Sequence, residues 1–295
     1  MKLCNDIIAI EVAEHGAELV SLKKDGHEYL WTGDAAYWNR HAPILFPAVG
    51  KPYNNELRAD GKVYPMKQHG YARDSEFEVI GDGRLRMKES NLSSNYPYRL
   101  GLEACYRLDG SDVEIEWTVK NLDEKDAYFQ IGAHPGFLLP DFDPRSMING
   151  YVRFYSKEGK RINPVLTSGL EDGNRVPKGA NNFLLHETPL MAGTFIHDAL
   201  IIEQGQVGAV QLYDKQCKPV LAVHCPQAEA FGIWAPHAQV GSTHATGICA
   251  PFVCLEPWCG ICDAKGFTGD IAERQYIHHL APKETYTFTY TIEIF

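Results

Sequence analysis

The last eleven residues, 285–295, alternate between polar residues and apolar or aromatic residues for almost their whole length. A period of two is the pattern of a β-strand that buries one face. We expect this segment to be a strand inside a sheet. The chain would then build its core from strands, and truncating this end should damage the fold.

Further strand patterns run through the chain. Residues 102–108 and 113–119, joined by a turn at 109–112, predict a hairpin with one buried face. Residues 7–12, 17–22 and 27–31 predict three more strands, and only 34–38 and 271–280 carry a modest helical pattern. The strands are short and the chain holds 26 glycines and 17 prolines in all, so we expect an all-β sandwich or barrel forming one domain over residues 1–295. The polar, glycine-rich residues 159–182 predict a surface excursion.

Composition narrows the classes of partner. The formal net charge is −10, whereas nucleic acids and anionic membranes require a basic surface. No apolar run approaches the roughly 18 residues of a membrane helix, and Asp6 and Glu11 interrupt any signal-peptide core near the start. We therefore expect a cytoplasmic protein that binds a small molecule.

The eight cysteines are scattered, mostly inside apolar runs, as at Cys105, Cys217, Cys225, Cys249 and Cys254. In a cytosolic chain this favours reduced core residues over disulfides. The spacing of Cys254, Cys259 and Cys262 matches the start of a plant-type iron–sulfur motif, but no fourth cysteine follows. We expect core cysteines here.

One charged residue, Glu256, stands in the apolar and cysteine-rich run 250–262. This run predicts a buried strand, and burial raises the pKa of a carboxylate toward the range of a general base. The alternative is a structural carboxylate that an arginine or backbone amides satisfy.

His134 is the second candidate. Apart from the phenol of Tyr128 it is the only ionisable side chain in residues 128–140, and the Pro135-Gly136 pair that follows predicts a sharp turn at a strand end. A histidine held there can donate or accept a proton. A core histidine bonded to a backbone carbonyl is the alternative.

Polar residues at three other places could line a pocket. His69 and Arg73 lie beside Gly70, Arg40 precedes the apolar run 42–49, and Asp198 precedes the apolar residues 199–202. Arginine and histidine donate to hydroxyl groups or anions. We expect Asp198 to be buried, either paired with Arg40 or Arg73 or accepting from sugar hydroxyls. A turn with solvated charges is the alternative for the 69–74 segment.

Other chemistries lack a matching pattern in the sequence. No H-x-H, H-x-x-E-H or H-x3-H pair of metal ligands is present, and the adjacent His278 and His279 would point in different directions. Acyl-hydrolase and nucleotide motifs are also missing. We expect neither a metal nor a cofactor.

Five segments together resemble the galactose mutarotase (aldose 1-epimerase) family, and in particular its LacX-like branch. They occur in the family's order and spread over most of the chain: residues 41–50, 68–74, 131–137, 195–200 and 252–263. The resemblance implies a large antiparallel β-sandwich, the galactose mutarotase-like supersandwich, with the sugar in an open cleft.

The resemblance also implies roles for residues of this chain. Glu256 would take the proton from the anomeric hydroxyl, and His134 would protonate the ring oxygen. His69 would hold or polarise the ring, Asp198 would bind sugar hydroxyls, and Arg40 would lie near the pocket. We expect an isomerase that interconverts the α and β anomers of a hexose, as a monomer or a homodimer.

Three other functions remain open. The segment 69–73 resembles hexose-6-phosphate mutarotases, in which Arg73 and Arg40 would bind the phosphate. A glycosidase would use Asp198 and Glu256 as its carboxylate pair. A non-catalytic carbohydrate-binding protein would keep aromatic residues such as Trp234, Trp258 and Tyr71, without needing a buried Glu256.

Overall fold

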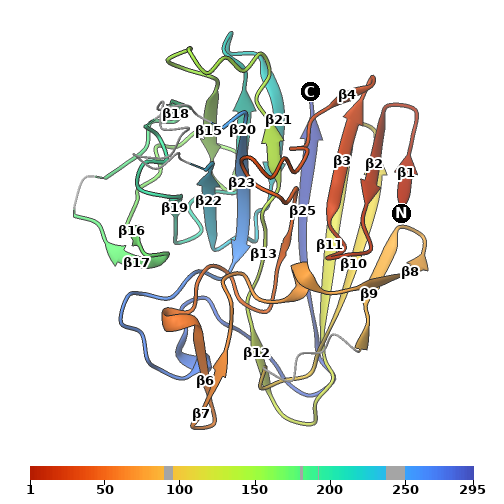
Figure 1. Cartoon of the computed structure of the whole chain (residues 1–295), viewed down its shortest axis with the longest axis vertical. Coiled ribbons are helices and arrows are strands. Elements are labelled where there is room, and N and C mark those ends of the chain that lie inside the picture. The colour runs from red at the N-terminus through yellow and green to blue at the C-terminus, as the bar shows by residue number, and fades with distance from the viewer. Residues whose placement is uncertain (90–95, 180–181, 192, 237–249) are drawn as a thin grey trace.

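The computed structural model describes residues 1–89, 96–179, 182–191, 193–236 and 250–295 (Figure 1). The described residues form strands and 3₁₀ turns and contain no α-helix. None of the helical turns in these residues is long and apolar enough to cross a membrane. The all-β prediction is confirmed; the single domain over residues 1–295 stays a prediction.

The largest sheet in the described residues has nine antiparallel strands. Its strands, in spatial order, are β18 (Glu187–Pro189), β15 (Tyr151–Tyr155), β20 (Ala209–Tyr213), β21 (Pro219–His224), β25 (Thr285–Ile294), β11 (Asp112–Asn121), β10 (Leu100–Asp109), β9 (Arg84–Met87) and β8 (Phe77–Gly81). The terminal segment therefore lies in the middle of the sheet as β25, as its alternation predicts. Trp117 of β11 faces Phe288 of β25, and their rings stack with centroids 5.3 Å apart.

The predicted hairpin is confirmed as β10 and β11. Asp109 pairs with Asp112, so Gly110 and Ser111 form the turn, and Gly110 has a positive φ of 58°. Positive φ suits the tight turns that join twisted antiparallel strands. Buried residues alternate with half-exposed ones along β11, so only one face of this hairpin joins the core.

Two smaller sheets lie against the long one (Figure 1). The first contains β1 (Lys2–Cys4), β2 (Ile8–Val12), β3 (Leu19–Lys24) and β4 (His27–Glu28). The second contains β19 (Leu200–Ile202), β22 (Ala230–Trp234), β23 (Phe252–Cys259), β13 (Ile131–Ala133) and β5 (Ile44–Leu45), with β14 (Gly136–Leu138) also paired to β23. One cluster of buried apolar side chains from all three sheets fills the space between the layers. This is the expected sandwich.

Short elements complete the fold. Three two-stranded pairs are β12 (Ala127–Phe129) with β24 (His278–Leu280), β16 (Ser168–Glu171) with β17 (Asn174–Pro177), and β6 (Glu56–Ala59) with β7 (Lys62–Pro65). Within the described residues, 3₁₀ turns cover Tyr53–Asn55, Ala72–Asp74 and Ile271–Glu273.

Both helical predictions are wrong. Residues 34–38 form only a turn, closed by the Tyr37 and Trp38 amides on the Asp34 carbonyl. Residues 271–280 begin as a 3₁₀ turn, but Arg274 is extended and Tyr276 has a positive φ of 53°. The buried Arg274 donates from Nε to Asp263 at 2.7 Å, a contact from outside the segment that fixes this change of direction.

The described cysteines are free, which agrees with the expectation of reduced thiols. Cys105, Cys225 and Cys254 are buried, whereas Cys217 is exposed and not the core residue expected. Cys249 lies outside the described residues. Cys254 and Cys259 are five positions apart on β23 and therefore face opposite sides of the sheet, so they do not converge on one cluster.

Candidate active site

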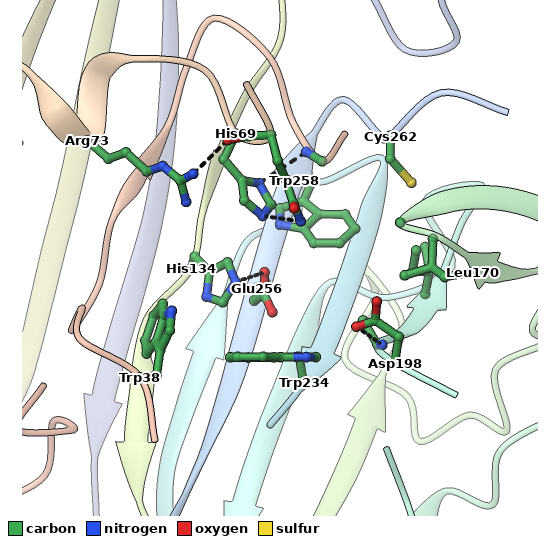
Figure 2. Close-up of a pocket in the computed structure, with 15 residues that line it drawn as sticks. Trp38, His69, Arg73, His134, Leu170, Asp198, Trp234, Glu256, Trp258 and Cys262 are labelled. Carbon is green, nitrogen blue, oxygen red and sulfur yellow. Dashed lines mark hydrogen bonds and ion pairs between the residues drawn. The ribbon is translucent and has the colours of Figure 1, made fainter. Parts of the chain in front are cut away.

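A cavity of about 390 Å³ opens at the six-stranded sheet (Figure 2). Strands β22 and β23, the end of β13, the loop after β7 and the hairpin β16–β17 contribute to its walls. The lining residues are Trp38, Gly50, Gln68, His69, Arg73, His134, Leu170, Gly173, Asp198, Ala199, Ile201, Trp234, Glu256, Trp258 and Cys262. Five of the six residues singled out from the sequence line this one cavity.

Glu256 lies in the middle of β23, between neighbouring strands on both sides. Every residue of this strand is buried, and Glu256 is 1% exposed. Its Oε2 has no hydrogen-bond partner among the described residues. The prediction of a carboxylate on a buried strand is confirmed, and no arginine or backbone amide satisfies this oxygen in the described part of the chain.

His134 follows β13 and lies beside Glu256. The Leu255 amide donates to the Pro135 carbonyl at 3.1 Å, which ties the turn after His134 to β23. His134 Nε2 lies 3.2 Å from Glu256 Oε2, and Nδ1 is buried without a hydrogen-bond partner in the described residues. Trp38 stacks on the imidazole at 4.9 Å, and Trp234 meets it edge-on at 5.6 Å. Aromatic packing therefore orients this ring.

Burial shifts the two pKa values in opposite directions. It raises the pKa of Glu256 well above its ordinary value, and the negative charge of Asp198 adds to this shift. Burial, together with the positive charges of Arg73 and Arg40, lowers the pKa of His134 to about 3. In both cases loss of solvation disfavours the charged form. The free site thus favours a protonated Glu256 and a neutral His134.

His69 is held by backbone contacts on both sides. Its amide donates to the Gly50 carbonyl at 2.8 Å, and its Nδ1 accepts from the Gly50 amide at 3.1 Å. Burial keeps the pKa of His69 well below its ordinary value, with His134 and the arginines adding to the effect. Because Nδ1 accepts a hydrogen bond, the neutral ring carries its proton on Nε2. The side-chain amide of Gln68 lies 3.2 Å from this nitrogen, so a ligand in the cavity would compete with Gln68 for it.

The two arginines differ in their positions. Arg73 lines the cavity and donates from Nη2 to the Gln68 carbonyl at 2.7 Å, while its Nε is buried without a partner in the described residues. Arg40 is not among the lining residues. It donates to Asp74 at 2.6 Å and to the Arg73 carbonyl at 3.2 Å, so Arg40, rather than Arg73, makes the ion pair with Asp74.

Asp198 lies at the cavity but is exposed, contrary to the expectation of a buried carboxylate. Its backbone has a positive φ of 70°, and its Oδ1 accepts from the Ala199 amide at 2.8 Å. Within the described chain it forms no ion pair with either arginine. Figure 2 shows it across Glu256 from Trp38 and Arg73, where it can accept hydrogen bonds from a ligand.

Trp258 forms the back wall because two glycines leave space for its ring. A Cβ on Gly132 would lie 2.7 Å from the indole, and one on Gly232 would lie 2.5 Å from it. The two glycines lie on β13 and β22, the strands on either side of β23. The indole Nε1 is buried and has no hydrogen-bond partner among the described residues. Tyr71, by contrast, does not line the cavity.

The hairpin β16–β17 supplies a wall that the sequence did not indicate. Residues 159–182 are polar and glycine-rich, yet Leu170 and Gly173 from this stretch line the cavity. Arg175 ties the hairpin down, because its Nε donates to the Cys262 carbonyl at 2.8 Å and its amide donates to the Asp263 carbonyl at 2.9 Å. These contacts join residues almost ninety positions apart, which local patterns do not reveal.

Known proteins resemble this chain over its whole length. The model of the aldose 1-epimerase family matches residues 1–292. The chromosomal LacX protein of Lactococcus lactis subsp. lactis is 28% identical over 313 aligned positions, which cover 100% of this chain and 99% of that protein. The plasmid-encoded LacX protein is 28% identical with the same coverage.

Two solved structures have the same fold. A galactose mutarotase related enzyme from Lactobacillus acidophilus superposes with a TM-score of 0.86 at 27% identity, covering 100% of this chain and 97% of that one. A galactose mutarotase-like protein from Lactobacillus casei ATCC 334 gives a TM-score of 0.84 at 25% identity, covering 100% and 99%. The supersandwich expected from the sequence is therefore the fold of this chain.

Proposed function

Because the chain belongs to the aldose 1-epimerase family, we propose that it interconverts the α and β anomers of a free aldohexose, with Glu256 as base and His134 as acid. The observation that carries this proposal is the contact of 3.2 Å between their side chains inside one cavity. Glu256 Oε2 and His134 Nδ1 have no hydrogen-bond partner in the described residues. A sugar hydroxyl could therefore engage Glu256 without breaking an existing bond.

The reaction requires two proton transfers at neighbouring oxygens. Opening a cyclic hemiacetal removes a proton from the C1 hydroxyl while the ring oxygen gains one. Rotation about the C1–C2 bond followed by closure in the reverse sense gives the other anomer. Each positioned acid or base typically contributes about 10²- to 10⁴-fold. Glu256 would act at the C1 hydroxyl and His134 at the ring oxygen.

The electrostatics of the pair fit this cycle. Ring opening starts from an ionised Glu256 and a protonated His134, and it leaves Glu256 protonated and His134 neutral. Both states carry the same net charge, because one proton has moved from one residue to the other by way of the sugar. Burial favours the second state. The open-chain sugar is therefore accompanied by the protonation state that the free site already prefers, and the ionised pair that starts ring opening is the less populated form.

The remaining cavity residues suit a neutral polyol. His69 can donate, Asp198 can accept, and Trp38, Trp234 and Trp258 offer ring faces to the C–H groups of a sugar. Arg73 is the only lysine or arginine among the described lining residues, and it already donates to Gln68. A phosphate group usually requires more positive charge than this. A hexose 6-phosphate is the second candidate, supported by the unpartnered Nε of Arg73.

The substrate is tested by following the optical rotation of freshly dissolved α-D-glucose, α-D-galactose and glucose 6-phosphate, with the spontaneous rate subtracted. We expect the protein to accelerate equilibration of a free sugar more strongly than that of the phosphate. A response confined to glucose 6-phosphate, lost on Arg73→Gln, would favour the second candidate. Sugar binding by calorimetry without any acceleration would favour a carbohydrate-binding protein.

We expect a bell-shaped dependence of kcat/KM on pH. In the active form, Glu256 and His134 hold one proton between them. Activity falls at low pH, where the pair binds a second proton, and at high pH, where it loses the first. The lowered pKa of His134 moves the acid limb below the ordinary imidazole value of 6.5, and the raised pKa of Glu256 places the alkaline limb above the ordinary carboxyl value of 4.5. Initial rates of optical rotation from about pH 2 to about pH 9 measure both limbs. An acid limb at or above 6.5 would contradict this assignment.

A further inference from the structure

A second group of converging side chains lies outside the cavity. Glu229 precedes β22, Cys259 ends β23, and His278 begins β24. One carboxylate oxygen, the sulfur and one imidazole nitrogen lie within 4.8 Å of one another. None of the three residues lines the cavity. Cys259 is three positions after Glu256 and so faces the opposite side of the strand.

The backbone holds these three residues in place. The Glu229 amide donates to the Trp258 carbonyl at 2.9 Å, and His278 pairs with Phe129 between β24 and β12. The His278 ring packs at 4.5 Å from Tyr286 and 5.6 Å from Phe129. Cys259 is 1% exposed. A ligand arriving here would meet side chains that already have fixed positions.

The polar atoms of the group are not fully satisfied by one another. His278 Nε2 lies 3.3 Å from Glu229 Oε2. Both atoms are nevertheless buried without a hydrogen bond among the described residues, so the contact lacks the geometry of a good ion pair. The Cys259 thiol makes a 3.4 Å hydrogen bond to the Gln227 carbonyl and also interacts with the Tyr286 hydroxyl. Buried polar atoms without partners are uncommon and call for a partner such as an ion or water.

We propose that Glu229, Cys259 and His278 form a binding site for a divalent ion of the zinc class. Zinc accepts thiolate, imidazole and carboxylate ligands together, whereas calcium and magnesium prefer oxygen alone. Bonds of about 2.0–2.3 Å in a tetrahedron place ligand atoms roughly 3.3–3.7 Å apart. Small side-chain movements would reach that spacing, and water would take the fourth position. The ion would displace the thiol proton of Cys259.

Such an ion would join three segments that are distant in sequence: the connection into β22, the end of β23 and the start of β24. It would therefore stabilise the strand that carries Glu256 without contacting the sugar. This inference does not depend on the proposed epimerase activity, because metal binding and stability are read independently of turnover.

Cobalt is the probe for this site, because Co²⁺ takes zinc ligands and absorbs light. Protein stripped with a chelator is titrated with Co²⁺, and one equivalent should produce visible bands and a near-ultraviolet thiolate-to-cobalt band that zinc abolishes. Zinc at about 100 times its Kd should raise the Tm by about 4 °C. Glu229→Gln, whose side chain is half-buried, should weaken cobalt binding at least about tenfold. Cys259→Ser should remove the thiolate band.

The matched control is Cys254→Ser, because Cys254, His134 and Glu256 form another group of atoms within 4.8 Å of one another. The thiolate band should survive in this variant. Its loss in Cys254→Ser and persistence in Cys259→Ser would place the ion in the cavity and overturn the proposal. Absence of any thiolate band in the wild-type protein would overturn it as well. Circular dichroism of each variant separates loss of binding from loss of folding.

Discussion

The Glu256→Gln variant should bind sugar with nearly wild-type affinity and turn it over about 100- to 10,000-fold more slowly. The amide has the shape of the carboxylate but cannot accept the proton of the C1 hydroxyl. Binding is measured by quenching of the tryptophan fluorescence, since Trp38, Trp234 and Trp258 line the cavity. Turnover is measured by optical rotation. Turnover within about threefold of wild type would contradict the role of Glu256.

The same variant should be more stable than wild type at neutral pH. The folded pKa of Glu256 is raised above its ordinary value of 4.5, so the unfolded chain releases this proton at a lower pH than the folded protein does. The free energy of unfolding of the wild-type protein therefore falls as the pH rises above about 4.5. Glu256→Gln has no carboxyl group at this position, so it escapes that loss of stability. The advantage in Tm should shrink toward pH 4.

Glu293→Gln is a suitable control for both measurements. Glu293 also lies beside a histidine, 2.9 Å from His224, but outside the cavity. It should keep turnover within about threefold of wild type. Equal losses of turnover in Glu256→Gln and in this control would mean that replacing a glutamate by glutamine disturbs the fold rather than the proton transfer.

Gly70→Ala should cause the largest loss of stability among single-methyl changes near the site. A Cβ at this position would lie 2.2 Å from the Phe46 carbonyl oxygen and 2.7 Å from Pro47 N, and the backbone has a φ of +71°. Both obstructing atoms belong to the backbone, so a side-chain rotation cannot relieve the clash. His69 precedes this glycine and would be displaced. We expect a loss of more than about 3 kcal/mol in urea unfolding, together with lower activity.

Gly61→Ala separates the two causes of that loss. Gly61 has nearly the same φ, +72°, but its Cβ would meet nothing within 4 Å. Gly61→Ala should therefore lose only the stability that an alanine costs in a left-handed backbone conformation, about 1 kcal/mol. Equal destabilisation by the two substitutions would show that the close approach to Phe46 has no energetic consequence.

Local patterns predicted the elements that depend on neighbours in the sequence. The alternation of residues 285–295 marked a strand of the long sheet, and the isolated charge in residues 250–262 marked Glu256. The turn after His134 placed that residue at the end of a strand. In each case the informative residues lie within a dozen positions of one another, so a single sequence contains them.

The remaining features depend on contacts between distant segments. Apolar neighbours suggested burial for Asp198, but a positive φ directs the chain so that this carboxylate stays exposed. Arg40 was expected at the sugar, yet Asp74 and the Arg73 carbonyl engage it. The hairpin carrying Leu170 has a surface composition, and contacts with distant residues, such as that of Arg175 with the Cys262 carbonyl, hold it as a cavity wall. Tertiary partners, which the local pattern does not specify, decide these positions.

The most direct test of the central claim is exchange between the two anomers at equilibrium, followed by proton NMR on the anomeric protons of glucose and galactose. With a catalytic amount of wild-type protein we expect exchange between the α and β signals at a rate well above the spontaneous one. The Glu256→Gln variant at the same concentration should give only the spontaneous rate. No acceleration by the wild-type protein with any hexose or hexose 6-phosphate, or equal acceleration by the variant, would contradict the proposed epimerase and its base.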